Sequence, residues 1–223
     1  MNFTPRLDIL PAAQRDFWPT LREVPRSFVL YGGTALALRL GHRESVDFVF
    51  FTAEPFDPTE LRRSLPMFRN ASLAQLGKHT LSMVVGPEQK VNLSFFGGLD
   101  NLGRVGEPEL TDDGVINVAS LLDVAACKAA VVYERAAAKD YRDIYALIKS
   151  GVTLEAIIGA AQTVYGGQYS AAITLKALTY YEDGDLKTLP KEVKNALSKA
   201  AANIGPIPTF ERLPGGLRGG AEN

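Results

Sequence analysis

The 223-residue sequence contains a single cysteine and only two histidines. One cysteine, Cys127, excludes an internal disulfide framework and suits a reducing compartment. Cys127 lies in a run of small apolar residues, which favours a position in the core over a role as nucleophile. The histidines, His42 and His79, are far apart in the sequence, and this argues against a zinc site of nitrogen and sulfur ligands.

The sequence also lacks a long apolar segment and an excess of charge of either sign. No run approaches the roughly 18 uncharged apolar residues that would span a membrane, and the N-terminus lacks a basic start followed by an apolar stretch. We therefore expect no contact with a membrane and a cytoplasmic location. The 24 Lys and Arg residues nearly balance the 25 Asp and Glu residues, so the net charge does not demand a nucleic acid as partner.

The most informative pattern begins with a strand and a pair of glycines. Residues 28–31 are aromatic or branched, and they predict a buried strand that Gly32 and Gly33 end. Thr34 can cap the helix that is predicted over residues 35–40. A glycine pair before a helix leaves backbone N–H groups free to bind an anion such as phosphate. The alternative is a tight turn that needs a positive φ angle.

A charged residue interrupts the next predicted strand, residues 45–51. Asp47 lies among alternating apolar side chains. An ionised carboxylate in such a strand costs several kcal/mol unless a charged group meets it. We therefore expect Arg43 or a bound cation to be the partner of Asp47.

These residues resemble a family motif. The pattern Gly-Gly-Thr-Ala, a short helix and Arg-x-Ser-x-Asp resembles the DNA polymerase β-type nucleotidyltransferase superfamily, and most closely its AbiEii/AbiGii toxin-like family. The resemblance implies metal-dependent transfer of a nucleotide from a nucleoside triphosphate (NTP) to a macromolecular acceptor. It implies that Asp47 is catalytic and binds Mg²⁺ or Mn²⁺. The implied nucleotide-binding residues are Gly32, Gly33, Thr34, Arg43 and Ser45.

The chain departs from this motif at one position. The family places a second Asp two residues after the first, on the same face of the strand, where the pair holds divalent metal; this chain has Val49. The sequence therefore leaves open whether the protein is an active enzyme, and two functions fit it. One is a nucleotidyltransferase impaired by Val49, and the other is a catalytically degenerate nucleotide- or partner-binding module. A purely structural α/β domain would leave a second matching segment unexplained.

That second segment lies in two predicted helices. Residues 121–132 are almost wholly apolar, so Lys128 must reach an edge or meet a partner. Residues 139–147 place Asp140 and Asp143 at i and i+3, which by composition alone indicates a solvated helix face. The resemblance implies instead that both aspartates are catalytic and that Lys128 contacts a triphosphate or pairs with an acid of the site. One of the aspartates would then compensate for Val49.

We expect an α+β fold: a nucleotidyltransferase-like mixed sheet flanked by helices, followed by a C-terminal helical bundle. Turn residues between short apolar runs predict three antiparallel strands within residues 71–96. The expected domains are residues 1–114 and 115–212, and residues 213–223 form a Gly-rich flexible tail. The partners implied by the resemblance are an NTP, a tRNA or protein acceptor, and an antitoxin.

Overall fold

The computed structural model describes residues 3–86 and 90–217. The chain divides into two compact units: residues 1–102, 107–120 and 214–223 form the first, and residues 103–106 and 121–213 form the second. The end of the predicted flexible tail, from residue 218 onward, lies outside the described residues. Compactness alone does not show that either unit folds by itself, so the expected domain boundaries stay a prediction.

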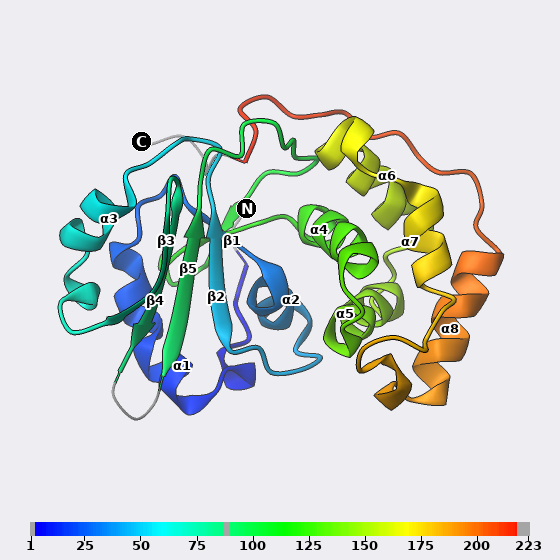
Figure 1. Ribbon diagram of the computed structural model, residues 1–223, viewed down its shortest axis with the longest axis horizontal. Coiled ribbons are helices and arrows are strands. Elements are labelled where there is room, and N and C mark those ends of the chain that lie inside the picture. Colours follow the sequence, from blue (N-terminus) through cyan, green and yellow to red (C-terminus); the bar gives the residue numbers. More distant parts are fainter. Residues whose placement is uncertain (1–2, 87–89, 218–223) are drawn as a thin grey trace. The chain divides into compact units, whose positions relative to one another are not determined.

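The first unit contains a mixed sheet with helices on both faces (Figure 1). The strands lie in the order β3-β4-β5-β2-β1-β7-β6, with β1/β7 and β2/β5 parallel and the other pairs antiparallel. Strands β3, β4 and β5 are the three antiparallel strands predicted within residues 71–96. The elements are η1 (Leu7–Ile9), α1 (Ala12–Phe17), η2 (Trp18–Glu23), β1 (Val29–Tyr31), α2 (Gly32–Leu40), β2 (Asp47–Phe51), α3 (Pro58–Ser64), η3 (Pro66–Phe68), β3 (Ser72–Gly77), β4 (Thr80–Val85), β5 (Val91–Phe96), β6 (Glu109–Leu110) and β7 (Asn117–Val118).

The two faces of the sheet differ in their burial. Phe48 and Phe50 of β2 are fully buried on one face, where the Phe50 ring stacks on Phe95 at 5.1 Å and the Phe48 ring lies 6.3 Å from Trp18. Figure 1 shows α1 and α3 on one side of the sheet and α2 on the other. The α2 side carries the alternate residues of β2, which are only partly buried. The aromatic residues of β2 therefore belong to the core under α1 and α3. On the α2 side, Val29 and Tyr31 of β1 are buried at 0% and 2% exposure, and the polar groups lie along the partly exposed face of β2.

Helix α2 is anchored at both of its ends. At its C-terminal end, Arg39 donates hydrogen bonds to the Glu109 carboxylate and to the Ala119 carbonyl, both at 2.7 Å. At its N-terminal end, the Thr34 hydroxyl donates to the Asp47 carbonyl at 2.6 Å. The prediction that Thr34 caps the helix was wrong, because the helix begins at Gly32 and its N-cap is Tyr31. Thr34 instead joins the first turn of α2 to the start of β2.

The second unit is the expected helical bundle. It contains α4 (Leu121–Glu134), α5 (Ala138–Lys149), α6 (Leu154–Tyr165), η4 (Gly166–Gln168), α7 (Ala171–Ala177), η5 (Leu186–Thr188) and α8 (Lys191–Ala202). The Asp123 carboxylate accepts hydrogen bonds from the backbone N–H groups of Val105 and Gly106, and so ties residues 103–106 to α4. Among the described residues, no single helix is long and apolar enough to cross a membrane; residues 138–149 and 154–168, bent by 118°, meet the length and composition criteria only as a pair.

The core of the first unit contains one polar side chain that lacks a partner. Gln14 of α1 is 1% exposed, and neither its amide nitrogen nor its amide oxygen has a hydrogen-bond partner among the described residues. An unsatisfied buried polar group costs about 1–3 kcal/mol. We therefore predict that Gln14→Met raises the free energy of unfolding by about 1–2 kcal/mol in urea denaturation.

The matched control is Gln162→Met, because Gln162 is exposed on α6 and its replacement should change stability by less than about 0.5 kcal/mol. A loss of stability in Gln14→Met would contradict the prediction and would show that the Gln14 amide binds a buried water molecule.

Candidate functional site

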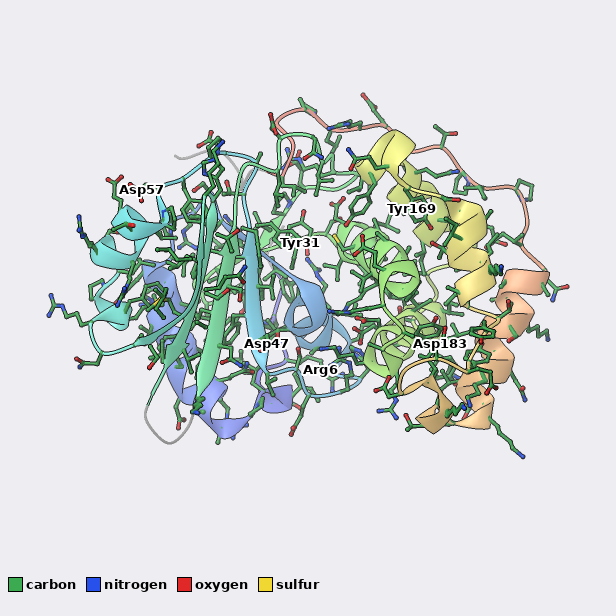
Figure 2. The ribbon with its side chains drawn as sticks, viewed as in Figure 1. Arg6, Tyr31, Asp47, Asp57, Tyr169 and Asp183 are labelled. Atoms are coloured by element: carbon green, nitrogen blue, oxygen red, sulfur yellow. The ribbon has the colours of Figure 1, made fainter. Side chains whose placement is uncertain are left out.

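The six predicted nucleotide- and metal-binding residues gather at one end of the sheet in the first unit. Strand β1 ends at Tyr31, β2 begins at Asp47, and their antiparallel register sets Tyr31 opposite Val49. Figure 2 labels Tyr31 and Asp47 on these neighbouring strands. Since α2 starts directly after β1, its first turn lies beside the beginning of β2. The six residues are Gly32, Gly33, Thr34, Arg43, Ser45 and Asp47.

The local geometry requires a glycine at position 32 and leaves little room beside Gly33. Gly32 has a φ angle of +76°, which L side chains rarely adopt. A Cβ atom on Gly33 would lie 2.8 Å from Nη2 of Arg43 and 2.9 Å from the Ser45 hydroxyl. The positive-φ turn expected from the sequence is therefore present. In addition, no side chain in the described part of the chain caps the N-terminus of α2, which leaves its first N–H groups able to receive an anion.

The partner of Asp47 is an amide. Nδ2 of Asn92 donates to Oδ1 of Asp47 at 2.9 Å, and the parallel register of β2 and β5 sets these two residues side by side. The expectation that Arg43 is the partner was wrong within the described residues. Arg43 lies in the loop before β2, donates to the Glu44 carbonyl at 2.8 Å and packs against Gly33. The sequence allowed Asn92 or Ser94 to supply a neutral oxygen near the site, and the pairing of β2 with β5 shows that Asn92 is the residue that meets Asp47.

Val49 occupies the place of the second carboxylate. It lies two residues after Asp47 on the same face of β2, between Tyr31 of β1 and Ser94 of β5. A Cβ atom on Gly32 would lie 3.6 Å from the Val49 Cβ, so the Val49 side chain borders the glycine turn. The chain therefore presents two methyl groups where the family motif presents two oxygen atoms.

These donors do not fit a divalent ion held by the protein alone. No three His, Cys, Asp or Glu side chains in the described part of the chain are grouped to hold a metal. On this face Asp47 offers one carboxylate, and Oδ1 of that carboxylate already accepts the Asn92 amide. One carboxylate suffices for Mg²⁺ only when substrate phosphates supply further oxygen ligands.

The three remaining predicted site residues form a buried ion cluster in the second unit. Nζ of Lys128 on α4 lies 2.8 Å from Oδ1 of Asp140 and 2.7 Å from Oδ2 of Asp143, both on α5. The aspartate side chains are fully buried and that of Lys128 is 7% exposed. Nε of Arg135 lies 2.9 Å from Oδ2 of Asp140. The solvated helix face indicated by composition was therefore wrong for both aspartates, and Lys128 pairs with acids.

The charges of this cluster balance. Burial by itself raises the pKa of Asp140, but the hydrogen bond from Arg135 and the charge of Lys128 outweigh it and hold the pKa below its ordinary value. Asp140 is therefore ionised at neutral pH. On the same helix as Lys128, burial raises the pKa of the Cys127 thiol to about 11, which keeps it protonated, as expected of a core residue.

Comparisons with known proteins agree with the motif. The family model described as "Nucleotidyl transferase AbiEii toxin, Type IV TA system" matches residues 21–212. An uncharacterized protein of Aquifex aeolicus is 33% identical over 159 residues, which cover 70% of this chain and 74% of that protein.

Two solved structures share the fold. The nucleotidyltransferase toxin MenT4 of Mycobacterium tuberculosis matches with a TM-score of 0.61 and 14% identity, over 87% of each chain. A protein of H. pylori assigned as a nucleotidyltransferase matches with a TM-score of 0.54 and 17% identity, over 85% of this chain and 90% of its own. At these identities the likeness shows the fold alone.

The ion cluster predicts a specific response to acid. The folded-state pKa of Asp140 lies below the unfolded value of about 3.9, so the folded protein binds this proton more weakly. The stabilisation from Asp140 is therefore complete above the unfolded pKa and is lost as the pH falls through the folded pKa. We predict that Asp140→Asn lowers the free energy of unfolding at pH 7 by about 3–5 kcal/mol, because it leaves Lys128 with one buried partner.

The measurement is urea denaturation between about pH 7 and pH 2, in which Asp140→Asn should lose less stability on acidification than the wild type. Asp183→Asn is the control, because Asp183 is an exposed carboxylate of the same unit and its removal should cost less than about 0.5 kcal/mol. Equal acid sensitivity in the wild type and Asp140→Asn would contradict the prediction.

Proposed function

Because the chain belongs to the AbiEii family, the nucleotidyl transferase toxins of type IV toxin–antitoxin systems, we propose that it binds a Mg²⁺–NTP complex at the turn between β1 and α2. In this proposal the chain transfers a nucleotide from the NTP to a macromolecular acceptor, and Val49 reduces the rate of transfer. The observation that carries the proposal is the meeting of the glycine turn with Asp47. The hydrogen bond from the Thr34 hydroxyl to the Asp47 backbone carbonyl holds the start of α2 beside the residue that carries the carboxylate. A phosphate group and its metal ion need these two features together.

Each residue has a distinct role in the proposal. The first backbone N–H groups of α2, in the turn formed by Gly32 and Gly33, bind phosphate oxygens. Arg43 and Ser45 lie against Gly33 and add a positive charge and a hydroxyl donor to the same turn. The second carboxylate oxygen of Asp47 contacts the Mg²⁺ that enters with the nucleotide as part of the substrate.

The reaction in this proposal is a displacement at phosphorus. An acceptor hydroxyl attacks the α-phosphorus of the bound nucleotide and gives its proton to water, the bond from the α-phosphorus to the bridging oxygen of the β-phosphate breaks, and pyrophosphate leaves. The hydroxyl belongs to a tRNA or a protein, an antitoxin restrains the activity, and the chain works in the cytoplasm, where nucleoside triphosphates are available. Catalytic roles for Lys128, Asp140 and Asp143 stay a prediction, since in the second unit these groups neutralise one another.

Val49 favours a second candidate function. Loss of a metal-bridging carboxylate removes charge stabilisation from the attacking and leaving oxygens, and this lowers the rate by orders of magnitude. A chain that keeps the glycine turn and Asp47 but has lost the second ligand suits a module that binds a nucleotide without turnover. Compensation for Val49 by Asp140 or Asp143 stays a prediction, and in the second unit both carboxylates contact Lys128.

The first test is thermal melting with ATP, CTP, GTP and UTP, each with and without Mg²⁺. We expect at least one nucleotide to raise the melting temperature in the presence of Mg²⁺, because a ligand at about 100 times its Kd stabilises the folded state by about 2.7 kcal/mol. In Asp47→Asn the Mg²⁺-dependent part of the shift should disappear. No shift with any of the four nucleotides would contradict a nucleotide-binding site.

A second test restores the missing ligand. Val49→Asp places a second carboxylate beside Asp47 on the same face, so we predict at least about tenfold tighter binding of Mg²⁺–ATP in calorimetric titration, equivalent to about 1.4 kcal/mol. Val46→Asp is the matched control, since Val46 is 55% exposed on the same segment and the substitution adds the same charge.

Equal affinity in Val49→Asp and the wild type would contradict the proposed geometry. Incorporation of labelled nucleotide into tRNA or protein separates the two candidate functions. Activity in the wild type supports the impaired transferase, and activity only in Val49→Asp supports the module without turnover.

A further inference from the structure

The two edges of the sheet in the first unit differ in length and charge. Strand β6 forms one edge, spans two residues and carries Glu109. Strand β3 forms the other, spans six residues, Ser72–Gly77, and contains no charged side chain. Edge strands present unpaired backbone N–H and C=O groups, and proteins usually protect them with charges, Pro or short length. Of the known protections strand β3 has only a bulge, between Leu73 and Gln75, and all six of its residues are exposed.

A bulge gives this edge an apolar surface. Leu73 and Leu76 are three residues apart, so regular alternation would set them on opposite faces of the strand. The register shifts between Leu73 and Gln75, and it pairs Leu73 with Met83 and Leu76 with Leu81. Directly opposed residues share a face, so both leucines continue the buried row of β4.

The leucines are nevertheless uncovered. Leu81 and Met83 are 0% and 1% exposed, whereas Leu73 and Leu76 are 42% and 52% exposed. The buried layer of the sheet thus ends at β4, although Leu73 and Leu76 of β3 lie on the same face. An added strand with apolar side chains on this face would cover both leucines.

The charges around β3 indicate the chemistry of the strand that would be added there. Between Glu60 and Glu88 the sequence contains no acidic residue but four cations, in a chain whose net charge is −1. All four cations are exposed: Arg62 and Arg63 in the last turn of α3, Arg69 before β3, and Lys78 directly after it.

A second copy of this chain is a poor match for this surface. Two β3 strands related by a two-fold axis pair antiparallel, and this sets Arg69 of one copy toward Lys78 of the other. Like charges in such positions repel. A segment with acidic ends meets both cations favourably.

We propose that the β3 edge, meaning residues 72–77 with the flanking Arg69 and Lys78, binds an extended acidic segment of another protein. The segment adds a strand to the sheet through backbone hydrogen bonds. Its apolar side chains cover Leu73 and Leu76, and its acidic ends meet Arg69 and Lys78. This inference does not depend on nucleotide binding or transfer.

The test uses the full chain and two synthetic nine-residue peptides. The acidic probe alternates Val and Thr in its centre and has two glutamates at each end, and the basic probe has lysines in place of the glutamates. We expect the acidic probe to bind at least about tenfold more tightly in fluorescence anisotropy, more weakly as salt increases, and to slow amide hydrogen exchange in residues 72–77.

Paired variants locate the binding surface. Arg69→Glu with Lys78→Glu should weaken binding of the acidic probe at least about tenfold, and Leu76→Glu should weaken it similarly, because it removes an apolar contact and repels the acidic ends. Lys176→Glu with Lys191→Glu makes the same change in charge at exposed positions of the second unit, and it should alter the affinity less than about twofold. All of these positions are exposed, and melting curves establish that each variant is folded.

Four results would overturn the proposal. The first two are a failure of the acidic probe to bind at concentrations up to about 1 mM and an equal affinity of the chain for the two probes. The other two are binding that leaves residues 72–77 unprotected and an unchanged affinity in the Arg69/Lys78 variant. Protection of residues 72–77 that grows with protein concentration in the absence of peptide would assign the edge to a second copy of the chain. Competition by a short single-stranded RNA that protects the same amides would assign it to nucleic acid, and either assignment would also overturn the proposal.

Discussion

The antiparallel pairing of β1 with β2 is the contact on which both the core and the candidate site depend. Its register sets Leu30 against Phe50 on the buried face and Tyr31 against Val49 on the opposite face. The same pairing brings the turn after β1 to the beginning of β2, where the Thr34 hydroxyl meets the Asp47 carbonyl. One set of backbone hydrogen bonds therefore holds an aromatic core on one side and a glycine turn beside a carboxylate on the other.

The two units use their carboxylates in different ways. Asp47 is partly exposed, has a neutral amide as its partner and retains one oxygen for a ligand. Asp140 and Asp143 are fully buried and share Lys128 within the bundle. Breaking such a buried pair leaves an uncompensated charge in the interior. The packing of α4 on α5 therefore depends on the ionisation of these groups. Asp47 thus differs from Asp140 in having a neutral partner and a partly exposed side chain.

Much of the fold follows from local patterns. The three antiparallel strands, the buried helix α4 and the glycine turn appear in the sequence as alternation, apolar content and turn residues. The partners of charged groups do not appear there. Asn92 meets Asp47 through the pairing of β2 with β5, across 45 positions of sequence. The bulge in β3 likewise sets Leu73 and Leu76 on one face, although their spacing places them on opposite faces of a regular strand.

By itself, the sequence determined the class of fold, the family motif and the missing carboxylate at Val49, because these depend on residue types at short spacings. Only the tertiary structure decided which group meets each carboxylate: the neutral amide of Asn92 meets Asp47, and the ammonium group of Lys128 meets Asp140 and Asp143. The reason is that a charge is stabilised by whatever group lies within a few ångströms. Strand register and helix packing set that distance between residues that are remote in the sequence.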